Sequence, residues 1–106
     1  MRINERASQI WPILAYAALH RQTITYDSLG KLIGVPRAGL GQLLGPIQRY
    51  CLDNKLPALT SIVVSEISGD PSHGFSAADN VQVAQSAVYR HDWLSTVPPT
   101  PDRFAS

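Results

Sequence analysis

The sequence predicts a single α+β domain that is mostly α-helical and is built as a winged helix-turn-helix with a short β wing and an extra C-terminal segment. Three observations predict this fold. Apolar residues recur at helical spacing in the first half, two short β-favouring segments interrupt them, and a loop rich in glycine and proline follows. A chain of 106 residues with 44% hydrophobic content is the usual size for one domain with one core.

The first predicted helix begins at a cap formed by Asn4 or Ser8 and ends near Arg21. Its apolar residues follow the three-and-four spacing of a stripe that faces a core: Ile10, Ile13, Leu14, Ala17 and Ala18. We place Pro12 in the opening turn, because a proline deeper in a helix removes a backbone hydrogen bond and clashes with the preceding turn. Trp11 beside it is predicted to anchor the core.

A β-favouring segment at 23–26 leads into the second predicted helix, which Asp27 or Ser28 caps. The apolar residues of this helix are Leu29, Leu32 and Ile33, and it ends at Gly34-Val35-Pro36. A third helix is predicted from about Arg37 to Leu52, with a break or kink at Gly45-Pro46. The order of helix, short turn and helix is that of a helix-turn-helix.

The rest of the chain is predicted to hold the wing and the C-terminal segment. The apolar, β-branched run 59–64 is typical of a buried strand, and 69–75 is predicted to form a loop or wing tip. From Ala77 to about Ala87 the pattern is weakly helical, and residues 88–90 fit either a helix or a strand. The proline-rich residues 97–101 predict an extended tail packed on the surface.

Charge is divided unevenly along the chain, although the net charge is only +1. Residues 1–55 carry seven Lys and Arg against three Asp and Glu, whereas 56–106 carry two against five. A basic first half suits a polyanionic partner, and the acidic second half suits a second partner or limits non-specific binding.

The single cysteine, Cys51, excludes an internal disulfide and a multi-cysteine metal site. No apolar run is long enough to span a membrane, so we expect a cytoplasmic protein.

Three stretches, in the same order, resemble the DNA-binding domain of alkylguanine-DNA alkyltransferases: Ile10-Trp11, Thr25-Tyr26-Asp27-Ser28-Leu29, and Arg37-Ala38-Gly39-Leu40-Gly41-Gln42-Leu43. The resemblance places a winged-helix core in 5–75 of the single domain 1–106, and leaves 76–106 without a counterpart. It implies that Tyr26 meets the phosphate of an extruded nucleotide. It also implies that Arg37 fills the gap left in the base stack, and that Ala38, Gly39 and Gly41 let the helix approach the minor groove.

Extruding a base costs a few kcal/mol, so both a phosphate contact and a wedge make physical sense. Simpler roles remain open for both residues, because Tyr26 is also suited to packing beside the first helix and Arg37 to an exposed place in a first turn. Lys31 and Arg49 add positive charges for phosphates, and Gln42 lies on the same predicted helix.

The sequence departs from the family at the nucleophile. The family's Pro-Cys-His-Arg motif falls on Leu59-Thr60-Ser61-Ile62, where neither hydroxyl has an adjacent histidine to activate it. We therefore expect no alkyl transfer and no enzyme activity. The resemblance to cysteine-less alkyltransferase-like proteins still implies a pocket for a modified base, formed by Thr60, Ser61, Gly74 and Phe75.

Other chemistry has little support in the sequence. Ser61, Asp70 and His73 lack the nucleophile elbow of a hydrolase, and His73, His91 and Asp92 lack the spacing of a metal site. We predict no cofactor and no metal. Trp93 is expected to cover the core. The preferred function is duplex DNA binding; the alternative is a protein-interaction module, such as an antitoxin, immunity or phage-defence accessory protein, that uses residues 77–95.

Overall fold

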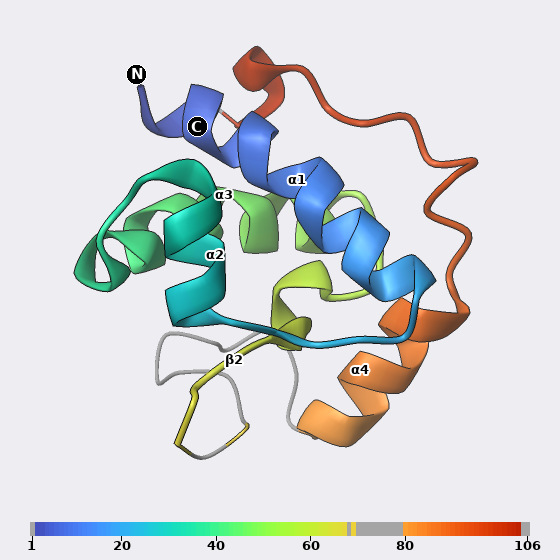
Figure 1. Cartoon of the computed structure of the whole chain (residues 1–106). Coiled ribbons are helices and arrows are strands. Elements are labelled where there is room, and N and C mark those ends of the chain that lie inside the picture. The colour runs from blue at the N-terminus through green and yellow to red at the C-terminus, as the bar shows by residue number, and fades with distance from the viewer. Residues whose placement is uncertain (1, 68, 70–79, 105–106) are drawn as a thin grey trace.

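The computed structural model describes residues 2–67, 69 and 80–104, and this part of the chain is a mostly helical α+β fold with a small sheet (Figure 1). In chain order the elements are α1 (Ile3–Leu19), β1 (Ile24–Thr25), α2 (Tyr26–Ile33), the 3-10 turn η1 (Arg37–Gly39), α3 (Leu40–Asp53), the 3-10 turn η2 (Leu59–Ile62), β2 (Val63–Val64), α4 (Val81–Arg90) and the 3-10 turn η3 (Pro101–Phe104). Figure 1 shows α1 crossing the molecule, with α2 and α3 near its first half and α4 near its end. None of the described helices is both long and apolar enough to cross a membrane.

The core forms around Trp11, which is 1% exposed, as its position in the apolar stripe predicts. Its ring lies 5.6 Å from that of Tyr50, 5.8 Å from that of Trp93 and 6.1 Å from that of Phe104. Trp93 is buried as predicted, and its indole N–H donates to the carbonyl of Val88 at 2.8 Å. Four segments of the chain therefore meet at one aromatic cluster.

The C-terminal tail is part of this core. It leaves α4, runs back along α1 and ends beside the first turn of α1 (Figure 1). The predicted extended conformation holds for 97–100, which have no regular structure. The η3 turn then buries Phe104 against Trp11 and Tyr50, so the tail is anchored at its far end.

Helix α1 begins earlier than predicted. Arg2 is its N-cap, so the predicted caps at Asn4 and Ser8 are wrong. Pro12 lies in the helix interior rather than in the opening turn. Its ring is on the exposed side, while Ala7, Ile10, Trp11, Leu14 and Ala18 are buried. Burial of that stripe stabilises a helix that its proline disfavours.

Helix α2 is capped by Thr25, whose hydroxyl accepts the Ser28 N–H at 3.1 Å, so the predicted caps at Asp27 and Ser28 are wrong. Its predicted end is confirmed: Gly34 has φ of 72°, a left-handed conformation that suits glycine at a helix C-terminus. Of the three apolar residues of this helix, Leu29 and Ile33 are buried, whereas Leu32 is 64% exposed.

Helix α3 continues through Pro46, so the predicted break at this residue is absent from the hydrogen-bonded helix Leu40–Asp53. The short η1 turn, which holds Arg37, precedes it. The apolar residues of α3 are buried at helical spacing on its inner face: Leu40, Leu43, Leu44, Ile47 and Cys51.

The predicted strand 59–64 is mostly wrong, although its burial is right. Only Val63 and Val64 form a strand, paired in parallel with Ile24 and Thr25 of β1. Residues 59–62 pack against α1, α3 and α4 rather than beside another strand. Their backbone therefore makes local bonds, such as Ser61 N–H to the Ala58 carbonyl at 2.9 Å.

The C-terminal helix α4 resolves the choice left open for 88–90, which are helical. Asn80 caps it by accepting the Val83 N–H at 3.1 Å. Of the predicted wing tip 69–75, only Gly69 belongs to the described residues, with φ of 73°. The rest of that loop and residues 76–79 lie outside them.

Candidate nucleic-acid interface

The outer face of α3 is the most open part of the predicted DNA-binding region. Gly41, Gln42, Gly45 and Arg49 are all exposed and follow one another at helical spacing. They lie opposite the inner face of the helix, which is buried in the core. One side of α3 therefore holds the domain together, and the other presents two bare glycines followed by an arginine.

The two glycines on this face are not required by packing. Apart from its chain neighbours and the backbone of its own helix, a Cβ atom placed on Gly41 or Gly45 would meet no atom within 4 Å, and neither residue has a positive φ. By contrast, a Cβ on Gly30 of α2 would lie 2.5 Å from the Val35 carbonyl oxygen. Glycine inside a helix destabilises it by about 0.5–1 kcal/mol relative to alanine. Gly30 is thus explained by the fold, and Gly45 is explained in part by Pro46, because the ring of a proline crowds a Cβ on the helical residue before it. Gly41 has no such explanation.

A groove runs between this face and the start of α1. Arg2 and Asn4 line it from α1, Gln42 and Arg49 from α3, and Phe104 from η3. Its apolar part comes from Ile3 and Leu52, which are half-exposed. The groove therefore combines two arginines with amide groups and open helix backbone.

A third arginine joins this region from the C-terminal tail. Arg103 and Arg49 line a second, smaller hollow with Asp53 and Asn54. The buried ring of Phe104 anchors the turn that carries Arg103. Sequence analysis missed Arg2 and Arg103, because only the folded chain brings its two ends to the last turns of α3.

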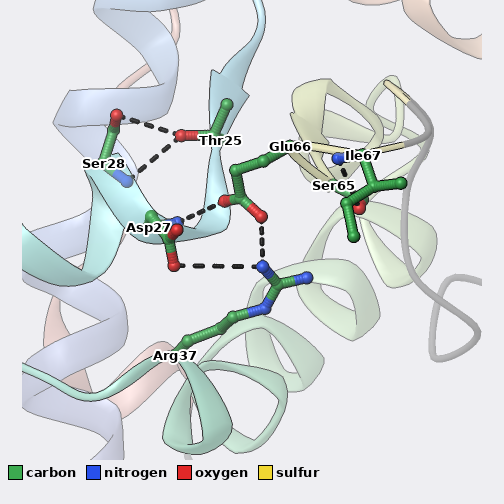
Figure 2. Close-up of polar contacts among 7 residues, drawn as sticks. All are labelled: Thr25, Asp27, Ser28, Arg37, Ser65, Glu66 and Ile67. Atoms are coloured by element: carbon green, nitrogen blue, oxygen red, sulfur yellow. Dashed lines mark hydrogen bonds and ion pairs between the residues drawn. The ribbon is translucent and has the colours of Figure 1, made fainter.

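Arg37 lies at the opposite end of α3 and has a different environment (Figure 2). Its guanidinium forms an ion pair with Glu66 and a longer one, at 3.9 Å, with Asp27. It also lies 5.6 Å from the centre of the Tyr26 ring, a cation–π distance. Within the described part of the chain, these are the only ion pairs, so Arg2, Arg49 and Arg103 differ from Arg37 in having none.

Glu66 connects the turn after β2 to the start of α2 (Figure 2). One carboxylate oxygen accepts the Asp27 N–H at 2.7 Å, and the other contacts Arg37. The hydrogen bond from the Asp27 backbone lowers the pKa of Glu66, and the charge of Arg37 adds to this effect. Sequence analysis did not single out Glu66, since no local pattern shows that it lies beside Arg37.

The remaining predicted DNA contacts differ in exposure. Lys31 and Arg37 line the same shallow hollow, and Ala38 is exposed. Gly39 is half-buried, because Val35 lies 3.2 Å from the position of its missing Cβ. Tyr26 is only 8% exposed, so it is a core residue, and the face of its ring contacts the Arg37 guanidinium.

The predicted base pocket is divided by the structure. Thr60 and Ser61 are 5% and 0% exposed, and within the described structure neither hydroxyl has a hydrogen-bond partner. Gln85 of α4 covers this place by donating to the Ser61 carbonyl at 2.8 Å. Gly74 and Phe75 lie outside the described residues. A base therefore has no open path to Thr60 or Ser61 in this arrangement.

Cys51 is a core residue and a poor nucleophile. It is 1% exposed on the inner face of α3, and burial raises the pKa of its thiol to about 11, despite a hydrogen bond with the Leu59 backbone that lowers it.

Of the three residues weighed as a hydrolase triad, Ser61 is buried, while Asp70 and His73 lie outside the described residues. Residues 2–67, 69 and 80–104 contain no group of His, Cys, Asp and Glu suited to a metal ion.

Comparison with protein-family models, curated proteins and solved structures finds no match for this chain. The family resemblance therefore remains a prediction.

Proposed function

We propose that this protein binds duplex DNA without catalysing a reaction, as an alkyltransferase-like winged helix whose recognition element is the outer face of α3. The observation that carries this proposal is the pair of glycines, Gly41 and Gly45, on a face bounded by arginines. Gly41 weakens the helix without relieving any contact with another part of the fold, and Gly45, which Pro46 favours, extends the same bare strip of helix backbone. A partner that approaches the helix closely explains them, and a DNA groove is such a partner.

The charges on this face suit the DNA backbone. Arg37 precedes the first turn of α3 and Arg49 lies near its end, roughly 18 Å apart at about 1.5 Å per residue. Phosphate contacts give affinity without sequence information, whereas contacts from Gln42 and the exposed backbone reach toward the bases. The limited positive charge of the chain leads us to expect moderate affinity that falls as salt is added.

Fluorescence anisotropy of labelled duplex DNA tests this function. Plain duplex and duplex containing O6-alkylguanine are titrated at two salt concentrations with wild-type protein, Arg37→Ala and the control Arg90→Ala, which changes an exposed arginine at the end of α4. We expect salt-sensitive binding that Arg37→Ala weakens and Arg90→Ala does not. Tighter binding to the modified duplex would extend the proposal to the sensing of damaged bases. Absence of binding at micromolar protein would overturn it.

A specific observation favours a second candidate function, a protein-interaction module. Four apolar side chains near the end of α1 and after α4 are 48–81% exposed: Tyr16, Leu19, Leu94 and Val97. Tyr16, Leu19 and Leu94 share a hollow with Pro12 and Pro98, and none of the described residues that line it is charged. Such a surface suits a protein rather than DNA. Leu94→Asp, which leaves the α3 face intact, separates the two: it abolishes binding to a protein partner and spares binding to DNA.

A further inference from the structure

The ion pair between Glu66 and Arg37 ties down the arginine that the proposed function uses most. Glu66 is 29 residues further along the chain than Arg37, and its carboxylate bridges the guanidinium and the Asp27 N–H. Backbone and side-chain contacts thus fix both oxygens of Glu66 (Figure 2). This is a specific arrangement rather than a chance approach of two long side chains.

The charges at this point are unbalanced. Arg37 faces two carboxylates, those of Glu66 and Asp27, so these three paired groups together carry one net negative charge. Lys31, which lines the same hollow, forms no ion pair with either carboxylate among the described residues. A DNA phosphate that approaches Arg37 meets repulsion from both carboxylates and must displace one of them. The lowered pKa of Glu66 agrees with a carboxylate that stays ionised at neutral pH.

We infer that Glu66 is an internal competitor that occupies Arg37 in the free protein and so limits the affinity of Arg37 for a DNA phosphate. The inference rests on the proposed function. In the free protein, Glu66 takes the place that a phosphate oxygen takes in the complex, and binding exchanges one anion for the other. Contacts at the open end of α3 do not require this exchange, because Arg2, Arg49 and Arg103 form no such ion pair with the residues that the structure describes.

The opposite role for Glu66 is positioning: holding Arg37 against the Tyr26 ring in the orientation that DNA needs. The two roles predict opposite effects of Glu66→Gln. Glutamine has nearly the same shape, and its carbonyl oxygen still accepts the Asp27 N–H, so the turn is retained. Only the negative charge of Glu66 is removed, and the carboxylate of Asp27 still faces Arg37.

The experiment measures duplex DNA affinity for wild type, Glu66→Gln, Arg37→Ala and the double variant, with Asp92→Asn as a control that removes one negative charge elsewhere. Asp92 contacts Ser95 and lies in the turn after α4. We expect Glu66→Gln to tighten binding by about three- to fivefold, which is the upper part of the range for an exposed ion pair. In the Arg37→Ala background the same change should produce no more than the effect of Asp92→Asn.

Every other outcome overturns the inference in a recognisable way. Equal gains with and without Arg37 would mean that only net charge matters. Weaker binding by Glu66→Gln would assign Glu66 to positioning. If wild type binds duplex DNA and Glu66→Gln binds it with the same affinity, the inference fails and the proposed function stands. If no variant binds duplex DNA, both the inference and the proposed function fail. Thermal unfolding of each variant checks that the fold is retained.

Discussion

The inner and outer faces of α3 belong to the same helix, but different principles explain their residues. On the inner face, each apolar side chain is buried and contributes to the core. On the outer face, Gly41 reduces helix stability although a larger side chain would fit, and Gly45 precedes Pro46. Folding therefore explains the residues of the inner face, and the proposed DNA partner accounts for the exposed backbone of the outer face.

The largest expected effect is a loss of stability when a residue of the inner face of α3 is truncated. Ile47 is fully buried, so Ile47→Ala should lower the free energy of unfolding by about 2–5 kcal/mol through lost burial and a cavity. Urea denaturation followed by circular dichroism measures this loss. A change below ~1 kcal/mol would mean that α3 does not pack as described.

The second prediction concerns Cys51, also on the inner face. Because burial raises the pKa of this thiol to about 11, it should not react with a thiol reagent in the native protein at pH 8. It should react fully once the protein is unfolded in guanidinium chloride. A fast reaction in the native state would show that this face opens to solvent or that the thiol is activated.

The third prediction sharpens the contrast between the faces. Gly41→Ala should raise the free energy of unfolding by about 0.5–1 kcal/mol, because helix propensity improves and no atom of another element is displaced. Gly45→Ala should raise it less, because the added Cβ crowds the ring of Pro46. The same changes should weaken DNA binding, since the added methyl groups hold the helix away from the groove. The matched control is Gly30→Ala, which must displace the Val35 carbonyl and should destabilise the fold. Stabilised variants with unchanged affinity would remove the main support for the interface.

The smallest expected effects concern the arginines at the open end of α3. If Arg49 and Arg103 each contact one phosphate, replacing either by alanine should reduce the slope of log affinity against log salt by about 0.9. Arg90→Ala serves as the control. Slopes that do not change would exclude this end of α3 from the DNA contact.

Sequence patterns predict the parts of the fold that depend on neighbouring residues. The apolar stripe of α1, the burial of Trp11 and Trp93, and the glycine that ends α2 follow from local spacing and backbone preference. Patterns fail where tertiary packing overrides local preference. Pro12 lies inside a helix because the flanking stripe is buried, and 59–62 form a 3-10 turn because helices rather than strands surround them.

The candidate site was predictable in part, for the same reason. Arg37, Gly41, Gln42 and Arg49 lie on consecutive turns, so helical spacing suffices to group them. The partner of Arg37 is Glu66, and the arginine beside Arg49 is Arg103, each far along the chain. No local signal encodes such contacts, because the packing of β2 and of the C-terminal tail determines them.

A titration of isotope-labelled protein with duplex DNA, followed by amide nuclear magnetic resonance shifts, shows directly whether the outer face of α3 binds DNA. We expect the largest shifts on the outer face of α3, at Ala38, Gly41, Gln42, Gly45 and Arg49, with inner-face amides changing less. Shifts centred on Tyr16, Leu19, Leu94 and Val97, or no shifts at micromolar protein and DNA, would contradict the assignment of this face to DNA.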